Sequence, residues 1–295
     1  MKVHPFIEAE KVAGHSVNNA CRLLEVSRSA FYARVSNPPC QRTLTDATLL
    51  EQIREVHDES KGTYGSPRIH QELAHRDVVC GKNRVARLMR VNGLEGRCKK
   101  RYRRTTTPDP SAELARDLIQ REFTPGPQIN RRYVGDITYI STWQGWAYLA
   151  TVIDLASRKV VGWALADHMR TELIEAALSC AFLSRRPPKG VVFHSDRGSQ
   201  YTSHDFAKLA RDNGVRLSVG RTGECWDNAV AESFFATIKR ELIETRPWPT
   251  RSGLRRAIFD YVEGWYNTKR LHSSLGYLSP AAYEAQYCRV ALDVA

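Results

Sequence analysis

Three closely spaced apolar segments follow residue 131, and they constrain the fold more than any other feature of the sequence. They are RYVGDITYIST, WAYLATVIDLAS and KVVGWALAD, with tight links at residues 144–145 and 157–158. Such segments are typical of an antiparallel meander. A helix over residues 171–183 then leads to another short apolar run at residues 191–193. The sequence therefore predicts an α/β unit.

Three acidic residues occupy special positions in this unit. Asp136 lies inside the first strand segment, where a buried charge is costly unless it is paired or bound to a metal. Asp196 follows the apolar run at 191–193, and Glu232 falls in the first turns of a predicted helix. Carboxylates on a strand, a strand end and a helix can converge on divalent cations. Taken singly, a carboxylate such as Glu232 is also typical of a helix cap or a dipole partner.

Charge is distributed unevenly along the 295 residues, which are enough for two or three domains. Residues 1–135 hold 24 Lys and Arg against 15 Asp and Glu, a net charge of +9, and residues 136–295 hold 20 against 17, a net charge of +3. An amino-terminal positive excess favours contacts with nucleic-acid phosphates, although a basic protein of another kind shows it too.

The seven cysteines are widely spread and include no CxxC pair. This pattern indicates reduced thiols and argues against a zinc module. No signal peptide or long apolar run is present in the sequence, so we expect neither export nor a membrane partner.

The amino-terminal part contains two helical units. Residues 17–35 indicate two short helices around a turn, as in a helix-turn-helix or simply two packed helices. Three further helices are expected within residues 44–96. The last of these, KNRVARLMRVNG, places Lys82, Arg84 and Arg87 on an outer face. That face is typical of a recognition helix in a major groove, and a solvated basic helix is the alternative.

Two other basic stretches are candidates for DNA contacts. RCKKRYRR contains Arg101 and Arg103 and indicates an exposed linker along a phosphate backbone. The cluster around Arg270 is suited either to holding DNA or to capping the core. We therefore expect a helical segment at 1–40, a helix-turn-helix domain at 43–96, a basic linker at 97–123 and a catalytic domain at 124–288.

Four strings in the chain resemble the second-frame protein of the insertion-sequence-3 family of bacterial transposases. They are GDITYI around Asp136, HSDRGSQYTS around Asp196, CWDNAVAESFFATIKRE around Glu232, and YNTKRLHSSLGYLSP. This family belongs to the Asp-Asp-Glu group that includes retroviral integrases. The resemblance implies a ribonuclease-H-like integrase core, a mixed five-stranded sheet with flanking helices, preceded by all-α helix-turn-helix units.

The resemblance also implies a chemistry. Asp136, Asp196 and Glu232 would be catalytic and would hold two Mg²⁺ ions, with Mn²⁺ as a substitute, for cleavage and transfer of DNA phosphodiesters. Lys239 matches a position where the family has a basic residue that contacts DNA. His194 precedes Asp196 by two residues and is expected either to orient substrate near it or to be a core histidine.

The implied partners are double-stranded DNA of the element's terminal inverted repeats and of the target, and further copies of the chain on that DNA. A first-frame protein with a helix-turn-helix and leucine zipper, or a frameshift fusion with it, is also implied, and the implied location is the bacterial cytoplasm at the nucleoid. Two alternatives remain open: a DNA-binding repressor without catalysis, and a ribonuclease-H-like nuclease without strand transfer.

Overall fold

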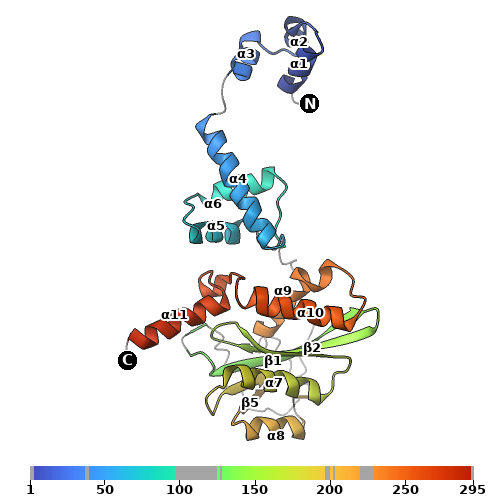
Figure 1. The fold of residues 1–295 in the computed structure, drawn as a ribbon, viewed down its shortest axis with the longest axis vertical. Helices are drawn as coiled ribbons and strands as arrows, with labels where there is room; N and C mark the ends of the chain where they lie inside the picture. The colour runs from blue at the N-terminus through green and yellow to red at the C-terminus, as the bar shows by residue number, and fades with distance from the viewer. Residues whose placement is uncertain are drawn as a thin grey trace, which may run out of the picture.

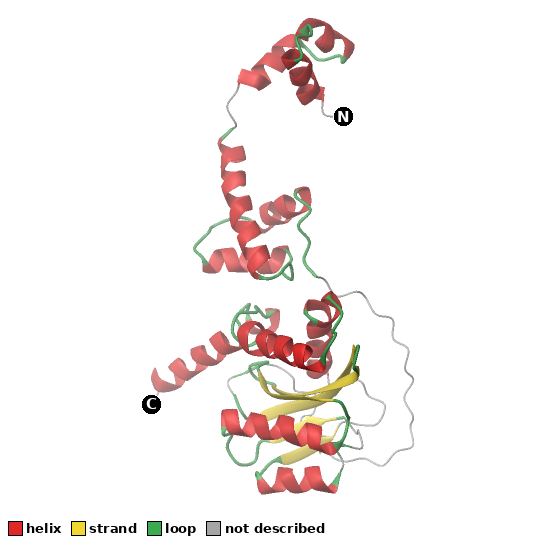
Figure 2. Cartoon of the chain, turned by 45° about the vertical axis from the view of Figure 1, so that its right-hand side comes forward, coloured by secondary structure: helices red, strands yellow, loops and turns green. Residues whose placement is uncertain are grey.

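The computed structural model describes residues 3–36, 40–97, 125–126, 128–196, 200–201, 203–219 and 229–293. Two groups of helices precede a sheet that carries helices on both faces (Figure 1). Figure 2 shows the same division, with helices alone in the amino-terminal part and strands confined to the later part.

The first helical group packs around a small apolar centre formed by Ile7, Cys21 and Phe31. Its helices are α1 (Val3–Val12), α2 (Val17–Leu23) and α3 (Arg28–Ser36). The second group consists of α4 (Gln41–Glu59), α5 (Ser66–His75) and α6 (Lys82–Val91). Apolar residues recur at intervals of three and four in these helices, and they bury one shared core that includes Ile53, Ile69, Leu73 and Val85.

The sheet contains five described strands in the order β3-β2-β1-β4-β5. They are β1 (Arg132–Thr142), β2 (Gly145–Asp154), β3 (Val160–Ala166), β4 (Val192–Ser195) and β5 (Arg216–Val219). β1, β2 and β3 form the expected antiparallel meander, and β4 and β5 join it in parallel pairing. The mixed sheet with flanking helices is the predicted ribonuclease-H-like fold.

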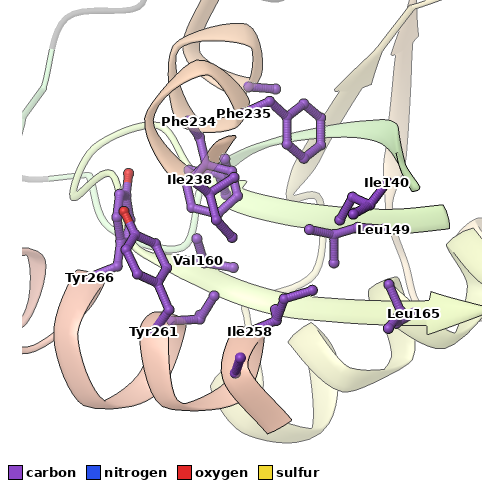
Figure 3. Close-up of a cluster of buried hydrophobic side chains, with 14 of the residues drawn as sticks. Ile140, Leu149, Val160, Leu165, Phe234, Phe235, Ile238, Ile258, Tyr261 and Tyr266 are labelled. Atoms are coloured by element: carbon purple, nitrogen blue, oxygen red, sulfur yellow. The ribbon is translucent and has the colours of Figure 1, made fainter. Parts of the chain in front are cut away.

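Helices cover both faces of the sheet and divide the core into two layers. On one face α7 (Thr171–Arg185) and α8 (His204–Asp212) pack against residues such as Tyr133 and Phe193. On the other face lie α9 (Ala229–Glu241) and α10 (Arg251–Tyr261), and Figure 3 shows Phe234, Phe235 and Ile238 directed at Ile140 and Leu149 of the sheet. Alternate residues of each strand therefore contact different helix layers.

The carboxyl-terminal segment contains a helix that changes type along its length. α10 ends at Tyr261 and continues as a π-helical turn, η3 (Val262–Tyr266). The wider turn lets Trp265 contact both the sheet core and the core of α4–α6. A 3₁₀ turn, η2 (Ile243–Thr245), lies between α9 and α10, and η3 is followed by a second 3₁₀ turn, η4 (Ser273–Leu275), and by α11 (Pro280–Asp293).

Candidate active site

Asp136 and Asp196 lie level with each other on neighbouring parallel strands. The pairing of β1 with β4 sets Val134 opposite His194, and each aspartate is two residues further along its strand direction. Parallel strands run about 4.8 Å apart, so the two carboxylates project from adjacent backbone positions. Asp196 comes directly after β4 ends at Ser195 and is exposed, whereas Asp136 is half-buried inside β1.

Both aspartates belong to the sheet face that α9 covers. Val134 packs in the core layer that contains Phe234 and Ile238 of α9. Side chains two residues apart on a strand share a face, so Asp136 is directed to the same side. Glu232 lies in the first turn of α9 and is exposed. The strand, the strand end and the helix expected from the sequence thus meet at one face.

The electrostatics of Asp136 reflect these acidic neighbours. Burial, followed by the negative charges of Asp196 and Glu232, raises the pKa of Asp136 to about 7. The backbone N–H of Ile137, which donates to Asp136 Oδ1 at 2.7 Å, and the charge of Lys239 oppose this rise. Among the described residues, no three His, Cys, Asp or Glu side chains are gathered closely enough to hold one ion together.

A glycine beside Asp136 fixes how closely the two strands pack. A Cβ atom at Gly135 would lie 2.2 Å from Cζ of Phe193, far inside van der Waals contact. Phe193 sits on β4, three residues before Asp196, and is 2% exposed. Glycine at position 135 therefore allows the Phe193 ring to pass over β1, which holds the strand that carries Asp136 against the strand that leads to Asp196.

Lys239 lies within the electrostatic reach of Asp136 and against an exposed aromatic pair. Its Nζ is 5.5 Å from the ring centroid of Tyr139, and the Tyr139 and Trp146 rings meet edge to face at 5.2 Å. The two aromatic side chains are 60% and 51% exposed. An ammonium group over an aromatic face is attracted to it, so the Tyr139 ring holds Lys239 beside the acids.

His194 is a buried residue between two strands. It is 1% exposed, and its Nδ1 lies 2.9 Å from Oγ of Ser218, its partner across β4 and β5. This hydrogen bond links the strand that ends at Asp196 to the edge strand of the sheet. The position agrees with a core histidine that supports Asp196 through the backbone.

The basic residues of α6 are only partly available. Lys82 is exposed, but Arg84 Nε donates to Asp46 Oδ1 at 2.6 Å, and Arg87 also donates to Asp46. Hydrogen bonds from Arg87 and Arg84 lower the pKa of the Asp46 carboxyl. The expectation that all three residues contact DNA is corrected here for Arg84 and Arg87, because these two arginines tie α6 to α4 through Asp46.

Arg270 also departs from the expectation of a DNA contact. Its side chain is 6% exposed, and its NH2 lies 2.7 Å from Oε1 of Glu241, which Nε also contacts. A guanidinium held in this way anchors the end of α9 through Glu241. Arg101 and Arg103 lie outside the described residues.

Sequence reasoning missed how the second helical group contacts the catalytic unit. Tyr64 Oη accepts from the Leu271 backbone N–H at 2.8 Å, and Arg68 Nε donates to the Leu271 carbonyl at 3.0 Å. These partners are about two hundred residues apart in the chain, and no local pattern signals them.

Within the described part of the chain, no helix is long and apolar enough to cross a bilayer.

Three family descriptions match the chain. Residues 126–225 and residues 213–280 each match an integrase core domain, and residues 44–102 match an HTH-like domain. The integrase descriptions together span the strands and helices that carry Asp136, Asp196 and Glu232.

Whole-length relatives are found among bacterial insertion elements. The chain is 35% identical over 288 residues to transposase InsF for insertion sequence IS3A of Escherichia coli K12. This alignment covers 95% of this chain and 97% of the relative. It is 36% identical over 271 residues to the 31 kDa protein of insertion element IS600 of Shigella sonnei, covering 92% and 99%. A putative transposase for element IS986/IS6110 of Mycobacterium tuberculosis is 36% identical over 270 residues, covering 90% and 96%.

Among solved structures, the magnesium complex of the HTLV-2 integrase catalytic core domain in its dimeric form is similar at 15% identity and a TM-score of 0.40. The match covers 53% of this chain and 97% of the other.

Proposed function

Because the chain belongs to the IS3 family of insertion-element transposases, we propose that it cleaves DNA at its element's ends and joins the freed 3′ hydroxyls to target DNA. Asp136, Asp196 and Glu232 are the proposed catalytic residues. The observation that carries this assignment is the level placement of Asp136 and Asp196 on the face covered by the helix of Glu232.

The donor set fits divalent cations. Three carboxylate groups supply the hard oxygen ligands that divalent cations prefer. Burial, and then the negative charges of Asp196 and Glu232, raise the pKa of Asp136, and a bound cation would stabilise its charged form. We propose that Asp136, Asp196 and Glu232 hold two Mg²⁺ ions, which Mn²⁺ can replace. When bound, such ions neutralise phosphate charge, lower the pKa of the attacking hydroxyl and stabilise the leaving oxygen.

Backbone and side-chain groups of the protein orient the Asp136 carboxylate and the DNA in this proposal. The Ile137 N–H donates to Asp136 Oδ1 and so holds this carboxylate in one orientation. Lys239 offers a positive charge for a phosphate next to the reacting one, and the exposed Tyr139 and Trp146 extend that surface with aromatic faces. A phosphodiester requires charge neutralisation and in-line placement more than a covalent nucleophile, so no serine is assigned that role.

The amino-terminal units supply end recognition in this proposal. An HTH-like match at residues 44–102 and the amino-terminal charge excess support contacts with the terminal inverted repeats. Exposed Lys82 is the α6 residue best placed for a phosphate. We further propose that copies of the chain assemble on DNA at the bacterial nucleoid, with a first-frame protein or as a frameshift fusion.

One assay separates this proposal from its alternatives. A labelled duplex that carries an element end is incubated with the chain and target DNA, with and without the first-frame protein. Cleavage followed by joining to target supports the transposase. Cleavage without joining would indicate a nuclease, and end binding without cleavage would indicate a repressor.

A further inference from the structure

A basic cavity lies where the second helical group meets the catalytic unit. It measures about 370 Å³, equivalent to roughly a dozen waters at about 30 Å³ each. Its wall includes Arg68 of α5, Arg158 from the link between β2 and β3, and Ser233 of α9, with Arg270, His272 and Ser274 from the carboxyl-terminal segment. Three arginines from three separate parts of the chain therefore border one space.

Contacts between the two units hold Arg68 at this cavity. Its Nε donates to the Leu271 carbonyl, and its guanidinium lies 5.8 Å from the Tyr64 ring centroid. Tyr64 in turn stacks obliquely on Trp265 at 5.5 Å between centroids. Tertiary contacts therefore fix the position of the Arg68 side chain.

Arginines are the charged residues among the described residues that line the cavity. Glu241 pairs with Arg270, and none of the described residues that line the cavity is acidic. Burial lowers the pKa of Arg158, and burial together with the charge of Arg270 lowers the pKa of Arg68. Cations that are desolvated and repel one another favour a bound anion.

His272 adds a polar atom without a partner. The side chain is 8% exposed, and its Nε2 has no hydrogen-bond partner among the described residues. Burial, then the charges of Arg270, Arg68 and Arg158, lower the pKa of this imidazole well below its usual range. A buried ring nitrogen without a partner is costly, and a water molecule bound to an anion in the cavity would satisfy it by donating a hydrogen bond.

The geometry points to a phosphate-binding site, and we propose that the basic cavity binds a backbone phosphate of the DNA that the enzyme processes. Arg68 and Arg158 supply the charge, and the hydroxyls of Ser233 and Ser274 supply further donors. Ser233 follows Glu232 directly on α9, and Arg68 belongs to the HTH-like unit. A phosphate bound here would fasten the unit that recognises the ends to the helix of the proposed active site. The phosphate site rests on the cavity itself, and only its assignment to DNA rests on the proposed function.

The first experiment measures thermal unfolding of the full chain in inorganic phosphate against sodium chloride of equal ionic strength. We expect the Tm to rise with phosphate and to saturate. Ser274 is exposed at the rim, so Ser274→Asp places a negative charge there without repacking the core. This variant should have a higher Tm than the wild type without phosphate and should lose the response to phosphate. Arg211→Gln, an exposed arginine of α8, serves as the matched control and should respond as the wild type does.

The opposite results are equally clear. A wild-type Tm that does not respond to phosphate, or a Ser274→Asp variant that responds fully, would overturn the site. A residue with only a structural role would not yield a variant that is both more stable and insensitive to phosphate.

The second experiment identifies the source of the phosphate through binding of a labelled element-end duplex. Arg68→Gln and Ser274→Asp should each weaken binding and reduce the log-log salt slope by about one unit, and Arg211→Gln should do neither. A phosphate response combined with unchanged DNA binding in both variants would overturn the DNA assignment in favour of a free anion. Asp136→Asn should keep the phosphate response, so a failure of the catalytic proposal is distinguishable from a failure of this one.

Discussion

Asp136 of β1 stands beside Asp196, one residue past the end of β4, because parallel pairing sets Val134 opposite His194. Two like charges on adjacent strands repel, and burial of Asp136 adds to the cost. The arrangement is suited to the cation site that we propose.

Removal of divalent cations should abolish cleavage and joining. Mg²⁺ or Mn²⁺ should restore both steps, whereas Ca²⁺ should support end binding with little chemistry, because its looser coordination positions the reacting oxygens poorly. The measurement is product formation on a labelled end after chelation and addition of each ion in turn. Undiminished turnover in excess chelator would exclude the metal mechanism.

Gly135→Ala should destabilise the catalytic unit by about 1–3 kcal/mol, because the added Cβ meets the buried Phe193 ring and forces it to move. Chemical denaturation gives the free energy of unfolding. Gly81→Ala is the control, since a Cβ there meets nothing within 4 Å. Phe193→Leu makes the side chain opposite residue 135 smaller. It should lower the free energy of unfolding less in the Gly135→Ala background than in the wild type. Equal losses in the two backgrounds would show that the side chains at 135 and 193 do not clash.

Glu241→Gln should destabilise the protein by about 3–5 kcal/mol, because it leaves the buried Arg270 guanidinium without its counter-charge. Glu244→Gln alters an exposed glutamate one turn beyond and should change stability little. Urea denaturation of both variants provides the comparison. A Glu241→Gln variant as stable as the Glu244→Gln variant would contradict the assignment of a structural ion pair.

Acid should weaken the same pair. Burial favours the neutral carboxyl, but the hydrogen bonds and charge of Arg270 prevail and lower the pKa of Glu241 below its unfolded-state value of 4.5. Its contribution to stability is therefore complete above that value and is lost as the pH falls through the folded-state pKa. In a pH series of unfolding free energies, the difference between wild type and Glu241→Gln should shrink below pH 4.5. A difference that stays constant there would be inconsistent with this pair.

Lys239→Ala should weaken binding of element ends and lower the log-log salt slope by about one unit while leaving the Tm nearly unchanged, because the half-buried side chain lies against the exposed Tyr139 ring. Lys208→Ala, at an exposed position of α8, should leave end binding intact. If Lys239→Ala unfolds the protein or keeps the wild-type salt slope, Lys239 is a packing residue and does not contact DNA.

The sequence predicts the sheet well because its information is local. Alternating apolar segments define β1, β2 and β3, and the break after Ser195 places Asp196 at a strand end. Such periodicity depends only on neighbours in the chain.

The pairing of distant charges could not be predicted in this way. The sequence around Arg270 is typical of an exposed basic residue, but Glu241, 29 residues away in the chain, forms an ion pair with it. Arg84 and Arg87 resemble a free basic face until α4 brings Asp46 against them. Arg68 carries no signal of its own, since the cavity that it borders forms only when two separate units meet.

Joining of a labelled element end to target DNA tests the central claim most directly. Asp136→Asn, Asp196→Asn and Glu232→Gln each remove a carboxylate and retain the size of the side chain, so each should abolish cleavage and joining while end binding stays near the wild-type value and the Tm is not lowered. The account predicts no joined product from any of the three, measured beside the wild type in Mg²⁺. Wild-type joining by any one of these variants would remove that residue from the active site and contradict the proposed mechanism.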